Sequence, residues 1–321
     1  MFLGIPYSED GVVLDPYLDA NLSGALNGES VTDIFIYSHG WWTSTAEAMV
    51  CYNRFAVGLA AAMAVDGPLP NGLALAIHWP SMLSENEHDW LNCFEAASFF
   101  TMEKRADHVG QRGVAPMLGE ILERTRNTEA RFHLIGHSFG CKVLCAALEE
   151  IVTTCDPAMH AGIDFNLMLL QAAFEDDALA TGGRYGRIAS QLPGLRVLIT
   201  KSSQDTALSE QFPRAHRLEL LDHEDRSALG AVGPTPQTIS AFGGAVQFTL
   251  AGPGCASGAP DFVKSRLWVA DLSAIHRERA ANGAFRPAEL AGQHSDIYFA
   301  EIYGLLALFL SRRADSNPAS L

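Results

Sequence analysis

The chain has 321 residues, of which 48% are hydrophobic and 18% are charged, so it holds enough apolar material to bury a large core. This composition excludes an intrinsically disordered chain, because disorder requires low hydrophobicity together with high charge. The formal charge of −15 repels phosphate backbones and anionic membranes, so nucleic acid is not expected as a partner.

The sequence shows neither a secretory signal nor a membrane span. Residues 1–13 lack a basic region followed by a long apolar core, and the longest apolar run, residues 302–310, is too short to cross a bilayer. The six cysteines follow no disulfide or zinc spacing, which favours reduced thiols. From these features we expect a cytoplasmic protein.

Six runs have the features of buried parallel strands, being short, rich in branched or aromatic residues, and closed by turn-forming residues. In chain order they cover residues 33–40, 73–80, 131–138, 165–174, 196–205 and 266–273. Helical spacing is seen in residues 46–65, 107–126, 139–152, 178–192 and 296–312. The alternation of strands and helices predicts an α/β fold with one central, mostly parallel sheet and helices on both faces.

Two connections are longer than simple crossovers require. They are residues 81–105 and residues 206–263, the second of which is rich in Gly, Pro and Ala near its end. Long connections in compact domains are commonly lids or functional loops. We therefore expect both to be cap or rim insertions above the sheet of a single domain that spans residues 1–321.

A serine between two glycines lies at a strand-to-helix junction. Gly136, Ser138 and Gly140 fit the pattern G-x-S-x-G, which is weak alone but specific where a buried strand ends and a helix begins. Glycines let the helix and strand approach closely. Ser138 is then left at a helix N-terminus, where free N–H groups favour negative charge. The alternative interpretation is a serine that only caps the helix.

With this junction, the chain resembles the α/β-hydrolase family from about residue 31 to residue 310. The segments HWPS (78–81) and FFTMEKRADHVGQRG (99–113) look like an incompletely characterised bacterial branch that carries a Trp-Pro-Ser motif. The resemblance implies a nucleophile at Ser138, followed along the chain by an acid and then a histidine. Only about 30 residues precede the first strand, so the family's N-terminal strand pair is expected to be shortened or missing.

The acid implied by the resemblance is Asp205, which stands in a loop just after a buried strand. Its work would be to hold the imidazole in one tautomer and to stabilise it once protonated. Glu175, Asp176 and Asp177, which follow the preceding strand, are the competing candidates.

Four histidines follow Asp205 and compete for the role of base: His216, His223, His276 and His294. The first two fall in the long insertion, and His276 lies among arginines that suggest an exposed helix. His294 lies in a small-residue loop that opens the terminal helix, as the family's histidine commonly does. We therefore favour His294.

An acyl-transfer intermediate also needs donors for its oxyanion. The resemblance implies the backbone N–H of Phe139, directly after the nucleophile, and the N–H of Trp41 in the loop HGWW (39–42). That loop could instead be a tight turn that anchors two aromatic side chains in the core.

Trp42, His137 and Trp90 are the candidates for a substrate pocket, although such aromatic residues more often belong to the core. The sequence contains no HExxH, no paired CxxC and no phosphate-binding loop. Neither a metal nor another cofactor is therefore expected.

These features together predict a serine hydrolase that cleaves small-molecule carboxylic esters through an acyl-enzyme on Ser138. An amidase, a thioesterase or an acyltransferase would use the same three side chains. A protein of another class, which keeps the fold for binding without turnover, is the remaining alternative.

Overall fold

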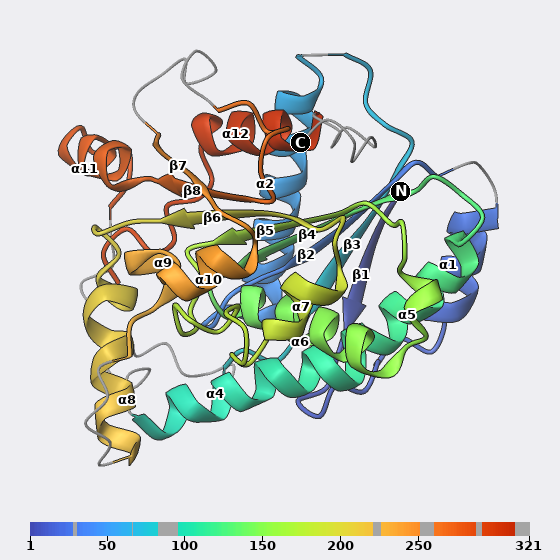
Figure 1. Cartoon of the computed structure of the whole chain (residues 1–321), viewed down its shortest axis with the longest axis horizontal. Helices are drawn as coiled ribbons and strands as arrows, with labels where there is room; N and C mark the ends of the chain where they lie inside the picture. Colours follow the sequence, from blue (N-terminus) through green and yellow to red (C-terminus); the bar gives the residue numbers. More distant parts are fainter. Residues whose placement is uncertain are drawn as a thin grey trace.

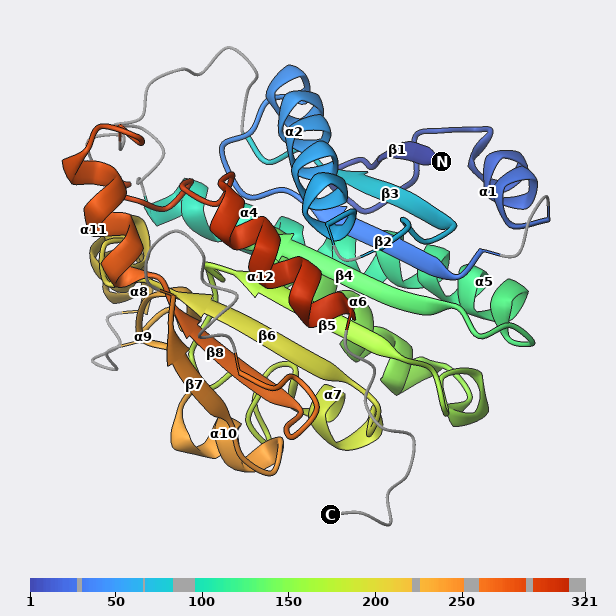
Figure 2. The same cartoon turned by 90° about the horizontal axis from the view of Figure 1, so that it is seen from above.

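The computed structural model describes residues 1–27, 31–65, 67–82, 96–220, 226–250, 260–286 and 291–311. Within these ranges one eight-stranded sheet is formed, and every neighbouring pair of strands in it is parallel (Figure 2). In spatial order the strands are β1 (Phe2–Pro6), β3 (Gly72–His78), β2 (Asp33–Ser38), β4 (Arg131–His137), β5 (Phe165–Leu170), β6 (Arg196–Lys201), β8 (Leu267–Asp271) and β7 (Val246–Thr249). The predicted α/β class with a central parallel sheet is confirmed.

Helices cover both faces of the sheet. Figure 1 shows α2 and α12 on one face and α4, α5, α6 and α7 on the other. The helices are α1 (Leu18–Asn27), α2 (Thr45–Met63), α4 (Ala96–His108), α5 (Ala115–Thr125), α6 (Phe139–Thr154), α7 (Gly186–Gln191), α8 (Phe212–Leu220), α9 (Leu229–Val232), α10 (Pro236–Ala241), α11 (Ser273–Ala281) and α12 (Ala300–Ser311). A π-helical segment, Val109–Val114, joins α4 to α5, and another, Ala207–Gln211, leads into α8. None of the helices that the structure describes combines the length and apolar character needed to cross a membrane.

Apolar side chains alternate along the central strands and supply two separate cores. In β4, Leu134 belongs to the core beneath α4, α5 and α6, whereas its neighbour Ile135 belongs to the core beneath α2 and α12. Successive side chains of a strand point to opposite faces, so a strand covered on both sides must be apolar throughout. This requirement explains why the central strands are continuous apolar runs in the sequence.

Two edge strands escape prediction from the sequence. β1 comes before the first predicted strand in the chain and pairs in parallel with β3 at one edge of the sheet. One strand therefore does precede β2 in the chain, where a shortened or missing strand pair is expected. β7 lies inside residues 206–263 and pairs in parallel with β8. The prediction that this segment lies wholly on the rim is therefore wrong for Val246–Thr249. Both strands are short and half-exposed, which weakens their apolar pattern.

The described parts of the other predicted insertion do not form a separate cap either. Residues 83–95 lie outside the described residues, and α4 begins at Ala96 and packs along the sheet against α6. The predicted helix 178–192 is also shorter than expected, beginning only at Gly186. Residues 176–185 form turns in place of the first part of the predicted helix. Gly183 packs tightly in these turns, where a side chain would collide with the backbone of Asp177 and Ala178.

Helix α2 begins at a capping box and packs against α12. The Ser44 hydroxyl accepts from the Glu47 N–H at 3.3 Å, and the Glu47 carboxylate accepts from the Ser44 N–H at 2.9 Å. Further along α2, Gly58 gives space to the ring of Tyr303 on α12. The contact between the two helices thus depends on the missing side chain of Gly58.

Replacing Gly58 with Ala should lower the free energy of unfolding by about 1–3 kcal/mol, because the added methyl group overlaps the Tyr303 ring. Replacing Gly304 with Ala should instead raise it by about 0.5–1 kcal/mol, because this position of α12 has open space for a methyl group. Urea unfolding of both variants measures the difference. Equal stabilities would contradict this packing of α2 on α12.

Candidate active site

Ser138 lies at the sharp turn between β4 and α6. Its φ of 55° and ψ of −125° form a conformation that residues with side chains rarely adopt. The flanking glycines make the turn possible: a methyl group on Gly136 would lie 2.5 Å from the Cα of Cys141, and one on Gly140 would overlap the Ser38 carbonyl. The chain therefore bends within two residues and presents Ser138 at the carboxyl edge of the sheet.

Two hydrogen bonds join Ser138, His294 and Asp205. The Ser138 Oγ lies 2.8 Å from the His294 Nε2, and the His294 Nδ1 lies 2.7 Å from the Asp205 Oδ2. An ionised carboxylate only accepts, so Nδ1 donates to Asp205 and Nε2 is left to accept from the Ser138 hydroxyl. An imidazole in this tautomer can take up the serine proton.

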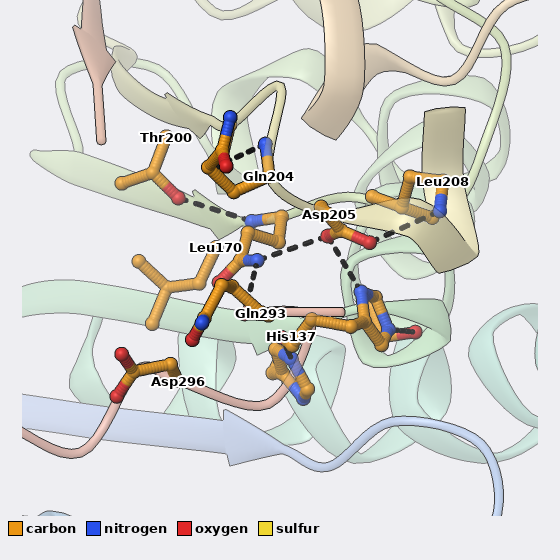
Figure 3. A network of polar contacts seen from close by, with 12 residues as sticks. His137, Leu170, Thr200, Gln204, Asp205, Leu208, Gln293 and Asp296 are labelled. Atoms are coloured by element: carbon orange, nitrogen blue, oxygen red, sulfur yellow. Dashed lines mark hydrogen bonds and ion pairs between the residues drawn. The ribbon is translucent and has the colours of Figure 1, made fainter. Parts of the chain in front are cut away.

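Asp205 is fully buried, and two further donors hold its carboxylate. Oδ1 accepts from the Leu208 backbone N–H at 3.0 Å, and Oδ2 accepts from the Gln171 side-chain amide at 2.9 Å. Figure 3 shows Asp205 in this network, with Leu208 on one side and Gln293 nearby. A buried charge needs such partners, and here they also fix the direction of the carboxylate.

The loop that carries His294 is fastened to the loop that carries Asp205. The Gln293 N–H donates to the Gln204 carbonyl at 3.0 Å. Between them Gly292, with φ 56°, packs so tightly that a methyl group there would lie 2.5 Å from the Gln204 oxygen. Only glycine suits that combination of backbone angle and space. The distance between His294 and Asp205 is therefore set by backbone contacts as well as by side chains.

The Trp-Pro-Ser segment after β3 holds the loop that follows β2. Trp42 donates its backbone N–H to the Ser81 carbonyl at 3.1 Å, and the Ser81 hydroxyl bonds both the N–H and the carbonyl of Thr43, at 3.1 and 2.9 Å. The Trp79 indole donates to the His39 carbonyl at 3.1 Å, and the two rings stack with centroids 5.5 Å apart. Residues 39–43 are thereby fixed next to Ser138, which Gly40 contacts.

The two residues whose backbone N–H groups are predicted to bind an oxyanion line the same cavity as Ser138. Phe139 is the first residue of α6, so its N–H has no acceptor within the helix. Gly40 approaches Ser138 so closely that a methyl group on it would lie 2.7 Å from the Ser138 Cβ. This contact places Trp41 in the same corner, where its ring lies 5.8 Å from that of Phe139.

A cavity of about 460 Å³ opens at Ser138 and His294. Its apolar wall is formed by Trp41, Phe99, Phe139, Leu208 and Phe212. Trp42 and His137, two of the predicted pocket residues, also line it. Trp90 lies outside the described residues.

A family model described as "Alpha/beta hydrolase of unknown function (DUF900)" matches residues 17–228. The chain belongs to this α/β-hydrolase family. The matched range contains Ser138 and Asp205 and ends before His294. Family membership identifies the protein as a hydrolase, and it leaves the bond that is cleaved open.

Searches for individual relatives add little. No curated protein matches the chain. Among solved structures, phospholipase PlaB from Legionella pneumophila in complex with thio-NAD matches at 14% identity with a TM-score of 0.28, covering 69% of this chain and 47% of that one. The hydrolase thus spans about half the length of the phospholipase, and a likeness this loose says nothing of its substrate.

Two buried histidines next to the site of this hydrolase are held neutral. Burial lowers the pKa of His39 and of His137 to about 3. The His39 Nδ1 donates to the Gly40 carbonyl at 2.8 Å, and the His137 Nε2 donates to the carbonyl of His294 at 2.9 Å. His137 therefore helps to hold the backbone of His294 without adding charge to the pocket.

The competing acids lie elsewhere. Glu175 accepts from Arg226 at 3.1 Å, and together with Asp176 and Asp177 it lines a separate cavity. Within the described part of the chain, Asp205 is the carboxylate bonded to His294.

The competing histidines are also held apart from Ser138. The expectation that His276 lies on an exposed helix is wrong: its side chain is buried, with hydrogen bonds to the Ser202 hydroxyl at 2.9 Å and the Asp296 carbonyl at 3.0 Å. Of the two neighbouring arginines, Arg277 is exposed, whereas Arg279 is partly buried and forms an ion pair with Asp296 at 2.8 Å. His216 is buried against aromatic rings, and His223 lies outside the described residues.

Among the described residues, Glu103, Glu175 and His216 could hold a metal ion, since one ligand atom of each lies within 4.8 Å of the others. Neither ring nitrogen of His216 has a hydrogen-bond partner among the described residues. However, Lys142 lies 2.8 Å from Glu103 and Arg226 lies 3.1 Å from Glu175, so cations already balance both carboxylates. A divalent ion would be repelled by these two groups, and we assign no metal-dependent step to the cluster.

Sequence reasoning misses Gln171 and Gly292, although both have a signal. Gln171 is the first polar residue after the apolar run of β5, at the strand end where the other functional side chains gather. The predicted strand 165–174 runs through it, whereas the observed strand ends at Leu170. Gly292 belongs to the small-residue loop just before His294.

Acidification should destabilise the protein through His39 and His137. Unfolded histidine takes up a proton near pH 6.5, whereas burial delays this step to about pH 3 in the folded chain. Between these values the unfolded state binds more protons, so the free energy of unfolding should fall as the pH falls, by about 1 kcal/mol per pH unit for each histidine. Urea unfolding across that range measures the slope. His137→Gln should show a smaller slope than the wild type, and an unchanged slope would contradict the neutral state of His137.

Proposed function

We propose that this hydrolase cleaves carboxylic esters through a covalent acyl-enzyme on Ser138. The observation that carries the proposal is the continuous path from the Ser138 hydroxyl through His294 to Asp205, with distances of 2.8 and 2.7 Å, at the mouth of a cavity. A serine hydroxyl is a weak nucleophile until a base removes its proton, and this arrangement supplies the base.

In the first half of the reaction, the Ser138 Oγ forms a bond to the acyl carbon while its proton passes to the His294 Nε2. The negative charge that develops on the carbonyl oxygen is met by the backbone N–H groups of Phe139 and Trp41. When the intermediate collapses, the bond to the leaving alcohol breaks, and the alcohol oxygen takes the proton from His294. The acyl group stays on Ser138.

In the second half, water takes the place of the alcohol. His294 removes a proton from the water, whose oxygen bonds to the acyl carbon, and the same N–H groups hold the second oxyanion. The bond to the Ser138 Oγ then breaks, the serine recovers its proton, and the acid leaves. In both halves Asp205 keeps the proton on Nδ1 and stabilises the imidazolium.

The cavity favours esters with an apolar acyl group. The rings of Phe99, Phe139 and Phe212 form one continuous wall, with centroids 5.3 Å apart for the first two and 5.6 Å apart for Phe99 and Phe212. Burial of an acyl chain against this wall would contribute about 0.8 kcal/mol for each methylene removed from water. Amides and thioesters present the same carbonyl carbon and belong in the substrate screen.

A fluorophosphonate probe should label the wild type at Ser138, and Ser138→Ala should lose both the label and at least about 10⁴-fold of p-nitrophenyl ester turnover. Ser295→Ala is a matched control, because this serine lines the same cavity but lies outside the hydrogen-bonded path. It should keep the label. A wild type that neither takes the label nor turns over esters, thioesters or anilides would show a binding protein instead.

Ala207→Leu should shorten the acyl chains that are accepted, because Ala207 lines the cavity and the larger side chain fills part of it. We expect kcat/KM for long-chain p-nitrophenyl esters to fall at least about tenfold while the acetate ester changes little. Ala284→Leu is the control, because Ala284 is exposed and is not among the residues that line the cavity, although its neighbour Phe285 is. Equal losses for short and long esters would place the acyl group elsewhere.

A further inference from the structure

Gln171 lies between the acid and the loop that carries the base. Its side-chain nitrogen is 2.9 Å from the Asp205 Oδ2 and 3.1 Å from the Gln293 carbonyl, and the residue is fully buried. Figure 3 shows this network around the labelled Asp205 and Gln293. An amide group has two N–H donors, so one can serve each acceptor.

The Asp205 oxygen that accepts from Gln171 is the one that accepts from His294. Oδ2 receives the Gln171 amide at 2.9 Å and the His294 Nδ1 at 2.7 Å. A shift of the amide would therefore displace the atom that orients the imidazole. Because Gln293 is the residue directly before His294, the second bond holds the backbone of the base in the same place.

The backbone of Gln171 is strained, and strain of this kind is typical of functional sites more than of residues that only pack in a core. Its φ is 47°, a region that favours glycine, and such strain costs about 1–3 kcal/mol. The strained backbone is secured from two directions. The Gln171 N–H donates to the Thr200 hydroxyl at 3.0 Å, and Gly230 packs directly on the Gln171 backbone.

The carbonyl of the same side chain argues against a general polar role in the core. The Gln171 Oε1 is buried and has no hydrogen-bond partner in the described part of the chain. An unsatisfied buried oxygen costs about 1–3 kcal/mol, which an apolar side chain of the same shape would avoid. Gln171 therefore combines a strained backbone with an unsatisfied carbonyl oxygen. The favourable interactions of its side chain are those of the two N–H donors.

We propose that Gln171 is a positioning residue, whose amide locks the Asp205 carboxylate to the His294 loop so that Nε2 meets the Ser138 hydroxyl. This inference rests on the proposed esterase function. It predicts that the amide acts on the rate of the chemical steps and leaves substrate binding almost unchanged, because Gln171 does not line the cavity.

The test compares Gln171→Met, which keeps the shape and removes both donors, with Gln171→Gly, which removes the donors and also relieves the backbone strain. Both variants should lose about 10- to 100-fold in kcat for a p-nitrophenyl ester, with KM within about threefold of the wild type. Gln211→Met is the matched control, since Gln211 is also buried and, among the described residues, is not a hydrogen-bond partner of Asp205, Gln293 or His294. It should keep the wild-type kcat.

A second readout does not depend on turnover. The proton between the His294 Nδ1 and Asp205 should give a low-field ¹H NMR resonance that is sharp in the wild type and in Gln211→Met, and broadened or lost in Gln171→Met. If Gln171→Met misfolds, Gln171→Gly gives the same comparison without the strain. A kcat within about threefold of the wild type in either variant, with the resonance retained, would overturn the inference.

The two proposals fail in different ways. If the wild type shows neither label nor turnover, the proposed esterase function fails, and the resonance still reports whether Gln171 orders the pair of His294 and Asp205. If the wild type is active and Gln171→Gly is equally active, the amide has no positioning role, while the esterase function stands.

Discussion

The site depends on one close approach between two backbone segments. The turn after β4 and the loop after β2 pack without side chains between them, because both Gly140 and Gly40 lie where a methyl group would collide with the other segment. Parallel pairing of β2 with β4 brings these two strand ends together at the same edge of the sheet. This contact brings Ser138 and the loop after β2 into one corner, so Gly140 serves the packing of that loop as well as the start of α6.

A second group of contacts builds the other half of the site from three loops that are far apart in the chain. Gln171 follows β5, Asp205 follows β6, and His294 comes just before α12, yet backbone and side-chain hydrogen bonds tie all three together. None of these loops could hold its functional side chain alone. The geometry of the site is therefore held by hydrogen bonds between loops at several strand ends, and most of the donors are uncharged.

The central sheet and the turn at Ser138 have strong local signals in the sequence, whereas Asp205 and His294 are favoured only through the resemblance to the family. Strands covered on both faces must be apolar throughout, and the serine turn needs glycines at fixed offsets. The edge strands β1 and β7 are short and partly exposed, so their pattern is too weak. The expectation for His276 is wrong because its charged neighbours suggest an exposed helix, whereas the imidazole itself is buried. The sequence marks Gln171 as a polar residue at a strand end, but its pairing with Asp205 is visible only in three dimensions.

The parallel direction of all neighbouring strands gives the molecule two unlike rims. Ser138, Asp205 and His294 meet at the carboxyl ends of the strands, where the cavity also opens, and none of these three residues lies at the amino ends. Insertions or replacements at the amino rim would change how firmly the sheet holds together without reaching the reacting atoms. Thermal endurance and substrate range can therefore diverge independently in relatives that share this architecture.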